Sequence, residues 1–350
     1  MASHSALRVS SLLILLSALL VAAPATAELD GRAATPDAEA TRLAEAIAAE
    51  PNPAVALAKV ESLQRLESHL TRTRYLTLLE QTADKADSPL VAFRLRRTAA
   101  RVRVDNGDLE HGRDGMKGPL GRQGCLTRWK VAGPFDNDNM QAYGERLGPE
   151  NGQSGPYEGK IGQIDWRTMP DFDDFCAIRL GTAVEPTTAA VAYLSTAVEV
   201  DRPVDARLLV GATGAYKIWV DGELVGQQPE NLGIAVDNQA WRVELEEGRH
   251  RVLVKLASQS SGSLGFVGRM VDADLKPVAG LSQTPAWGAE AVQAANSTEG
   301  PTPTDQGVRA RAKACAEGEG SPAAWCTWLW RRAESATAAN PWRDAATRLL

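Results

Sequence analysis

Histidine and cysteine are the residues here that could form a hydrolytic centre, because an imidazole next to a thiol makes a base–nucleophile pair. Of the four histidines, His4 lies near the N-terminus, and the others are His69, His111 and His250. None lies in a nucleophile motif, and the sequence has no G-x-S-x-G, P-loop or HExxH pattern. The sequence therefore predicts no catalytic residues, and we expect a protein that is not an enzyme.

The four cysteines are Cys125, Cys176, Cys315 and Cys326. A zinc site would need CxxC or clustered Cys/His spacing, and neither occurs. An even number of cysteines in an oxidising compartment favours two disulfides, for which three pairings exist. We predict Cys125–Cys176 and Cys315–Cys326, because each bridge then stays inside one predicted domain. The second bridge would staple a helical hairpin.

Residues 1–27 have the pattern of a cleavable export signal. Arg8 precedes an apolar run from Leu12 to Ala23, and Ala25-Thr26-Ala27 gives the small-x-small site of signal peptidase. An uncleaved membrane anchor is the alternative. We expect a periplasmic or secreted protein with no transmembrane segment once the signal is removed, which is the oxidising setting that disulfides need.

The charge of the chain argues against nucleic acid as a partner. The formal net charge is −6, and loss of Arg8 with the signal makes it more negative. The arginine-rich stretch from Arg94 to Arg103 alternates with Leu90, Leu95 and Val102 at helical spacing. It is therefore interpreted as a solvated helix face.

Two acidic clusters have enough oxygen atoms for a Ca²⁺ ion. Asp136 and Asp138 belong to the first, and Asp171 and Asp173 to the second. The first does not continue as an EF-hand, because Met140 stands where another oxygen ligand belongs. Turn formation by Asp and Asn explains both clusters, and a structural calcium ion is the alternative. No other cofactor is expected.

The elements that would position these residues change in type along the chain. Apolar residues recur at threes and fours before residue 106, short β-branched segments follow residue 125, and helical spacing returns near the C-terminus. The fold class is multidomain, α plus all-β, with a short helical N-terminal region, a β-sandwich (jelly roll) and a C-terminal helical hairpin or the start of a helical repeat. The predicted boundaries are 36–106 helical, 107–124 linker, 125–281 sandwich, 282–304 linker and 305–350 helical.

Turn residues divide the β region into short strands. Asp221-Gly222 between two apolar runs is a strong hairpin signal. The acidic-Gly turn Glu246-Glu247-Gly248 predicts that the segments on either side pair with each other. The predicted strands are 192–200, 207–211, 216–220, 223–225, 241–245, 250–256 and 266–272.

Three tryptophans are candidates for sugar binding, since sugars stack on flat aromatic rings. They are Trp219, Trp166 and Trp241. Period-2 alternation places Trp219 opposite Tyr216 and Ile218 on its strand. If those two residues face the core, Trp219 is exposed or packs under a loop. The alternative for all three is a core or loop anchor.

The C-terminal tryptophans follow helical spacing. Trp325, Trp328 and Leu329 lie at i, i+3 and i+4. Packing between helices is the favoured interpretation, and a peptide groove that includes Trp330 is the alternative.

Four motifs resemble a known module. Trp129–Asn137 (WKVAGPFDN), Tyr157–Lys160 with Asp165-Trp166, Tyr216–Val225 (YKIWVDGELV) and Leu245–Leu256 (LEEGRHRVLVKL) are together similar to a galactose-binding-like (PA14-like) jelly roll. The resemblance covers residues 125–281. It points to exported bacterial proteins in which helices precede the sandwich and tetratricopeptide repeats or a DUF3857 transglutaminase-like domain follow it. The C-terminal helices are similar to the start of such repeats.

The resemblance implies binding and not catalysis, because no Cys-His-Asp set of the transglutaminase type is present. We expect an exported scaffold or binding protein that contacts protein or carbohydrate at the cell envelope. The alternative is the non-catalytic front end of a transglutaminase-like peptidase whose catalytic domain lies beyond residue 350.

Overall fold

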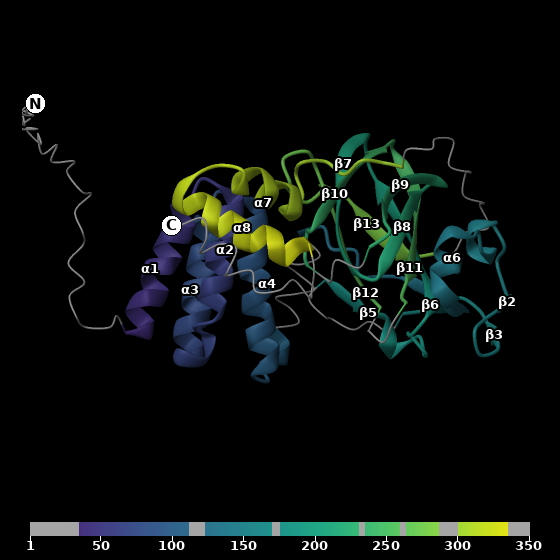
Figure 1. Ribbon diagram of the computed structural model, residues 1–350, viewed down its shortest axis with the longest axis horizontal. Helices are drawn as coiled ribbons and strands as arrows, with labels where there is room; N and C mark the ends of the chain where they lie inside the picture. The colour runs from purple at the N-terminus through teal and green to yellow at the C-terminus, as the bar shows by residue number, and fades with distance from the viewer. Residues whose placement is uncertain are drawn as a thin grey trace, which may run out of the picture. The chain divides into compact units, whose positions relative to one another are not determined.

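The helices before the sandwich form two pairs with the same spacing. The computed structural model describes residues 35–111, 123–169, 176–230, 235–259, 264–286 and 300–334, and the predicted export signal lies outside them. Helices α1 (Pro36–Ala48) and α3 (Arg72–Lys85) begin 36 residues apart, and so do α2 (Pro53–Gln64) and α4 (Pro89–Asp105). A short 3-10 turn, η1 (Glu67–His69), connects the pairs. Figure 1 shows the four helices side by side.

Local sequence explains where the second helix of each pair begins. Both α2 and α4 have proline in their first turn, where the missing N–H costs no helical hydrogen bond. Asn52 caps α2, its side-chain oxygen accepting from the backbone N–H groups of Ala54 and Val55. Helix α2 therefore begins at Pro53 and α4 at Pro89.

The sandwich consists of two antiparallel sheets, as predicted (Figure 1). The seven-stranded sheet has the order β4 (Arg167–Thr168), β1 (Lys130–Asp136), β6 (Ala190–Val200), β11 (Gly248–Ala257), β8 (Ala215–Val220) and β9 (Glu223–Gln228), with β13 (Ser282–Pro285) also paired to β6. The four-stranded sheet has the order β10 (Gln239–Leu245), β7 (Val204–Thr213), β12 (Gly265–Val271) and β5 (Ala177–Arg179), and a 3-10 turn, η5 (Leu180–Thr182), follows β5.

Each sheet is packed on its inner face and covered at least in part on its outer face. The inner faces meet in one core that contains Leu194, Ile218 and Phe266. Residues 137–166 (the cap) lie over the outer face of the seven-stranded sheet, whereas helices pack on part of the outer face of the four-stranded sheet. Strand β12 is buried throughout, and β6 is buried except at Glu199, so neither shows the alternation of a half-exposed strand.

The cap is built from short elements. They are η3 (Asp138–Met140), α6 (Gln141–Gly144), η4 (Gly148–Glu150), β2 (Tyr157–Glu158) and β3 (Gln163–Ile164). Its side chains pack with Tyr193, Trp219 and Leu253 from the seven-stranded sheet. The cap is therefore part of the folded sandwich.

Two strand predictions have different outcomes. The Asp221-Gly222 hairpin is confirmed: β8 pairs with β9, and both turn residues have positive φ, at 49° and 84°. The pairing of residues 241–245 with 250–256 is wrong. Strand β10 pairs with β7 and β11 pairs with β6 and β8, so the turn at Glu246 crosses from one sheet to the other. The apolar faces of β10 and β11 thus meet across the core.

The sheet also extends into residues 282–304, which were predicted as a linker. Strand β13 pairs with the second half of β6. The Gln283 side chain continues this pairing, because its Oε1 accepts from the backbone N–H groups of Thr127 and Arg128 and its Nε2 donates to the Arg128 carbonyl. A glutamine amide here acts like one more peptide group of a strand.

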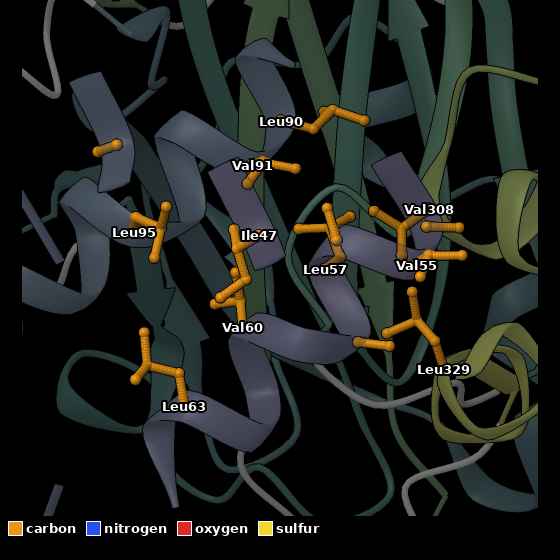
Figure 2. Packing of buried hydrophobic residues seen from close by; sticks show 14 of the residues in the cluster. Ile47, Val55, Leu57, Val60, Leu63, Leu90, Val91, Leu95, Val308 and Leu329 are labelled. Carbon is orange, nitrogen blue, oxygen red and sulfur yellow. The ribbon is translucent and has the colours of Figure 1, made fainter. Parts of the chain in front are cut away.

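The C-terminal hairpin consists of α7 (Val308–Ala316) and α8 (Gly320–Glu334). Its apolar residues join one core with the N-terminal helices, and Figure 2 shows Val308 and Leu329 near Val55 and Leu57 of α2. Trp328 is 1% exposed in this core, as the packing interpretation predicts. The hairpin therefore completes the helical layer, which also contacts Leu209 of the four-stranded sheet.

Both predicted disulfides are confirmed. Cys125 pairs with Cys176 and Cys315 with Cys326, and none of the described cysteines is free.

Replacing Cys315 and Cys326 together by alanine should lower the free energy of unfolding by about 3 kcal/mol, because a short loop is no longer closed in the unfolded chain. Urea unfolding of the variant and of the oxidised parent measures this. A loss below about 1 kcal/mol would contradict the prediction.

Candidate functional site

Two of the three candidate tryptophans are buried. Trp219 is 4% exposed beneath the cap, and Trp241 is 1% exposed in the sandwich core. Neither ring offers a face to a sugar, so the stacking prediction is wrong for both and they are anchors. The half-buried Trp166 donates its indole N–H to the Tyr157 hydroxyl at 2.7 Å, and its sugar contact remains a prediction.

The first acidic cluster is held by protein contacts. Asp136 accepts from Lys160 Nζ at 2.7 Å, and this contact lowers the pKa of the Asp136 carboxyl. Asn137 donates to the Ser258 carbonyl, while the exposed Asp138 begins a 3-10 turn. Within the described ranges no group of three or more His, Cys, Asp or Glu is arranged to hold a metal ion. Asp171 and Asp173 lie outside those ranges.

The arginines of α4 are paired with acidic residues of the neighbouring helices. Arg94 contacts Glu61 of α2 at 2.7 Å, Arg96 contacts Asp84 of α3 at 3.1 Å, and Arg101 contacts Glu67 at 3.0 Å. Arg101 is exposed, as the solvated-face interpretation predicts, whereas Arg94 is half-buried between the helices.

Histidine and cysteine form no catalytic pair in the described part of the chain. All four cysteines are in disulfides. His250 Nδ1 lies 2.6 Å from Asp221 Oδ2, and its Nε2 lies 2.7 Å from the Glu246 carbonyl. This histidine therefore ties the β8–β9 turn to the β10–β11 turn.

A buried ion pair fastens the cap to the seven-stranded sheet. Lys255 Nζ donates to Glu150 Oε1 and to the Glu145 carbonyl, both at 2.6 Å, and the Tyr193 hydroxyl also donates to Glu150. The side chains of Lys255 and Glu150 are 0% and 3% exposed. Desolvation lowers the pKa of Lys255, although Glu150 opposes it, and desolvation together with Glu150 raises that of Tyr193.

A second buried ion pair lies between the four-stranded sheet and α4. Arg269 on β12 forms a bidentate contact with Asp237, from Nε to Oδ1 at 2.9 Å and from Nη2 to Oδ2 at 3.0 Å. The guanidinium also lies 3.7 Å from the centre of the Phe93 ring. Arg94 adds a contact to the Val236 carbonyl at 3.3 Å. The helical layer and the sandwich thus share polar contacts as well as apolar ones.

A polar chain crosses the sandwich core near β9 and β10. Trp241 Nε1 donates to the Tyr216 hydroxyl at 3.0 Å, Tyr216 donates to Gln239, and Gln239 donates to Gln228 at 2.9 Å. Burial raises the pKa of Tyr216. This chain fixes the side chain of Gln239 at the beginning of β10.

A hollow that could receive a partner lies between α1 and α3. Its cavity volume is about 450 Å³. Ala44, Leu78 and Thr82 are buried and form its floor, while Gln81 and Lys85 are exposed at its rim. The remaining lining residues are Thr41, Glu45, Ala48, Ala49 and Arg74. We call this hollow the α1–α3 groove.

One end of the groove is closed by fixed polar contacts. Arg74 Nε donates to Asp37 Oδ1 at 2.6 Å, and its Nη2 donates to Thr41 Oγ1 at 2.7 Å. The alanines of α1 leave room for a peptide backbone to approach closely. The rim groups Glu45, Gln81 and Lys85 can hydrogen-bond to such a chain. The arrangement suits binding, and it contains no nucleophile paired with a base.

Comparison with known proteins gives little further information. No protein-family model and no curated protein matches the chain. A β-glucosidase from Kluyveromyces marxianus in complex with glucose is 19% identical over 26% of this chain and 12% of its own, with a TM-score of 0.22. A GH31 α-xylosidase from Xanthomonas citri is 14% identical over 46% of this chain and 16% of its own, with a TM-score of 0.22. The chain thus spans less than a fifth of either enzyme, and these likenesses carry no argument.

Among the described residues, no helix has the length and apolar character needed to cross a membrane.

Proposed function

We propose that this protein is an exported, non-catalytic binding protein that contacts a peptide segment of another protein through the α1–α3 groove. The observation that supports the proposal is the groove itself, with a buried floor of Ala44, Leu78 and Thr82 below an exposed polar rim. Its volume of about 450 Å³ is that of a pocket for a drug-sized ligand, roughly 300–1,000 Å³, so the groove would take a short part of the peptide.

The sandwich has a supporting role in this proposal. Its two most promising aromatic rings, Trp219 and Trp241, are buried, and the outer face of its larger sheet is covered by the cap. Protein is therefore the better partner class, and carbohydrate would have to use Trp166. Two disulfides support a periplasmic or secreted location.

Selection of peptides from a phage-displayed library on the full chain tests the groove. Replacing Ala48 with arginine should weaken binding of the selected peptides by about tenfold or more, because the long side chain occupies the space that the alanine leaves open. Ala38→Arg is the matched control, since Ala38 is exposed on the same helix and does not line the groove. Fluorescence anisotropy with labelled peptides gives the dissociation constants.

The proposal fails if the selected peptides bind Ala48→Arg and Ala38→Arg equally well. It also fails if no peptide binds the full chain more tightly than about 100 μM, a limit weaker than most specific recognition.

A further inference from the structure

Most charged side chains of α1 and α3 have a partner within the protein. Their ion pairs are Asp37–Arg74, Glu39–Arg42, Glu80–Arg103 and Asp84–Arg96. Arg72 donates to the Asn106 carbonyl. Glu45 on α1 and Lys85 on α3 are the exceptions, because neither side chain has a partner in the part of the chain that the structure describes.

Both exceptions line the α1–α3 groove. Glu45 is exposed on its α1 side and Lys85 on its α3 side. Arg74 is the third charged residue of the lining, and it is engaged by Asp37 and Thr41. On these two helices, the charges that the described residues leave without a partner are therefore found at the groove.

Neither helix supplies what Glu45 lacks. Glu45 lies in the last turn of α1, where the exposed carbonyl groups favour cations and disfavour a carboxylate. Arg42, one turn earlier, is already bonded to Glu39 through two of its nitrogens. Lys85 is no more than a neighbour along the groove, since no contact joins it to Glu45. A cation brought by a ligand would therefore be favourable at Glu45, and an anion at Lys85.

The helix geometry sets the distance between the two charges. The contact of Arg74 with Thr41 fixes the level of α3 against α1, and the groove runs from there toward the C-terminal end of each helix. At 1.5 Å per residue, Glu45 lies about 6 Å and Lys85 about 16 Å beyond this level. The two charges are thus offset by about 10 Å along the groove, which is the length of about three residues of an extended peptide.

The alternation of an extended peptide agrees with this offset. Side chains three positions apart in an extended chain point to opposite sides. Glu45 and Lys85 also lie on opposite sides of the groove, one on each helix. A single extended segment can therefore reach both charges at once.

We propose that the α1–α3 groove selects a peptide that carries a basic and an acidic side chain about three positions apart. Glu45 contacts the basic side chain and Lys85 the acidic one, while the residues between them lie on the floor formed by Ala44 and Leu78. The inference rests on the proposed function, to which it adds the charge pattern of the partner.

The phage-selected peptides are the probes for this inference. We expect them to be enriched in a basic and an acidic residue about three positions apart. Replacing the acidic residue of such a peptide with glutamine should weaken its binding to the parent protein by about threefold, the effect of one exposed ion pair. The same replacement should have no effect on binding to Lys85→Gln, where the partner of that residue is already absent.

The basic residue is tested in the same way against Glu45→Gln. Crossed combinations are the internal control: loss of the acidic residue should still weaken binding to Glu45→Gln, and loss of the basic residue should still weaken binding to Lys85→Gln. Lys313→Gln is the matched control, because Lys313 is exposed on α7 and does not line the groove. It should leave all dissociation constants within about 1.5-fold of those of the parent.

Two results would overturn the inference. One is a set of selected peptides without the pair of charges. The other is an equal loss of affinity for the parent and for the matching glutamine variant when a peptide charge is removed. If Ala48→Arg still weakens binding in either case, the proposed function stands and the charge pattern alone is wrong. If Ala48→Arg binds the peptides as Ala38→Arg does, the groove is not their site and both proposals fail.

Discussion

Replacing Arg269 with methionine is expected to lower the free energy of unfolding by about 3–5 kcal/mol, because it leaves a buried carboxylate without its cation. Arg269 and Asp237 are 1% and 4% exposed, so water cannot take over the solvation of Asp237. The variant also loses the contact between the guanidinium and Phe93 of α4. Urea unfolding followed by tryptophan fluorescence measures the change.

The double variant Arg269→Met/Asp237→Asn separates the lost charge from the lost packing. Asp237 has a positive φ of 57°, a conformation that asparagine tolerates well, so the second substitution adds little backbone strain. If charge is the main cause, the double variant should recover at least half of the stability lost by Arg269→Met. A single variant within about 1 kcal/mol of the parent would contradict the prediction, as would a double variant less stable than the single one.

This ion pair illustrates what the sequence alone did not reveal. Arg269 lies in a strand and Asp237 in a turn 32 residues earlier, and each looks like an ordinary surface charge in its own segment. Their burial depends on α4, whose Phe93 covers the guanidinium. The sequence around Arg269 therefore gives no sign that a helix distant in sequence will cover its side chain.

Local chemistry did predict the parts of the fold that depend on neighbours in sequence. The Asp221-Gly222 turn needs positive φ at two positions, and Asp-Gly is a pair of residue types that favours this conformation. The Cys315–Cys326 bridge joins two helices separated by a short turn. By contrast, the turn at Glu246 was interpreted as a hairpin although it crosses between sheets, because a crossing and a hairpin use the same turn residues.

Alternation assigned Trp219 to the outer face correctly, and it left open whether the ring is exposed or lies under a loop. Alternation places Tyr216 and Ile218 in the core and Trp219 on the outer face. The cap that buries the ring consists of elements of two to four residues, and its Gly- and Pro-rich sequence is typical of a loop. A period-2 pattern tells which face a side chain takes, and not whether a distant segment covers that face.

The groove left only a weak signal in the sequence. Ala44, Ala48 and Ala49 line the groove. Alanine is also the residue that favours a helix most strongly, so their presence in the sequence indicates a helix and gives no separate sign of a groove. The 36-residue spacing of the two helix pairs, marked by Pro53 and Pro89, was the one regularity that could have drawn attention to the groove.

The second large effect is expected at Lys255. Lys255→Met should lower the free energy of unfolding by about 3–5 kcal/mol, because the buried Glu150 carboxylate would keep the Tyr193 hydroxyl but lose the ammonium group that balances its charge. Since this pair joins η4 of the cap to β11, the loss should begin in the cap. Hydrogen exchange followed by mass spectrometry should show faster exchange in residues 137–166 than in β6 or β12.

The double variant Lys255→Met/Glu150→Gln tests this reasoning. Glutamine removes the second charge and keeps an acceptor for the Tyr193 hydroxyl, so the double variant should regain at least half of the lost stability. A coupling energy below about 0.5 kcal/mol in the double-mutant cycle would show that the two side chains act independently. If hydrogen exchange became faster by the same factor throughout the sandwich, the ion pair would stabilise the whole domain and not the cap in particular.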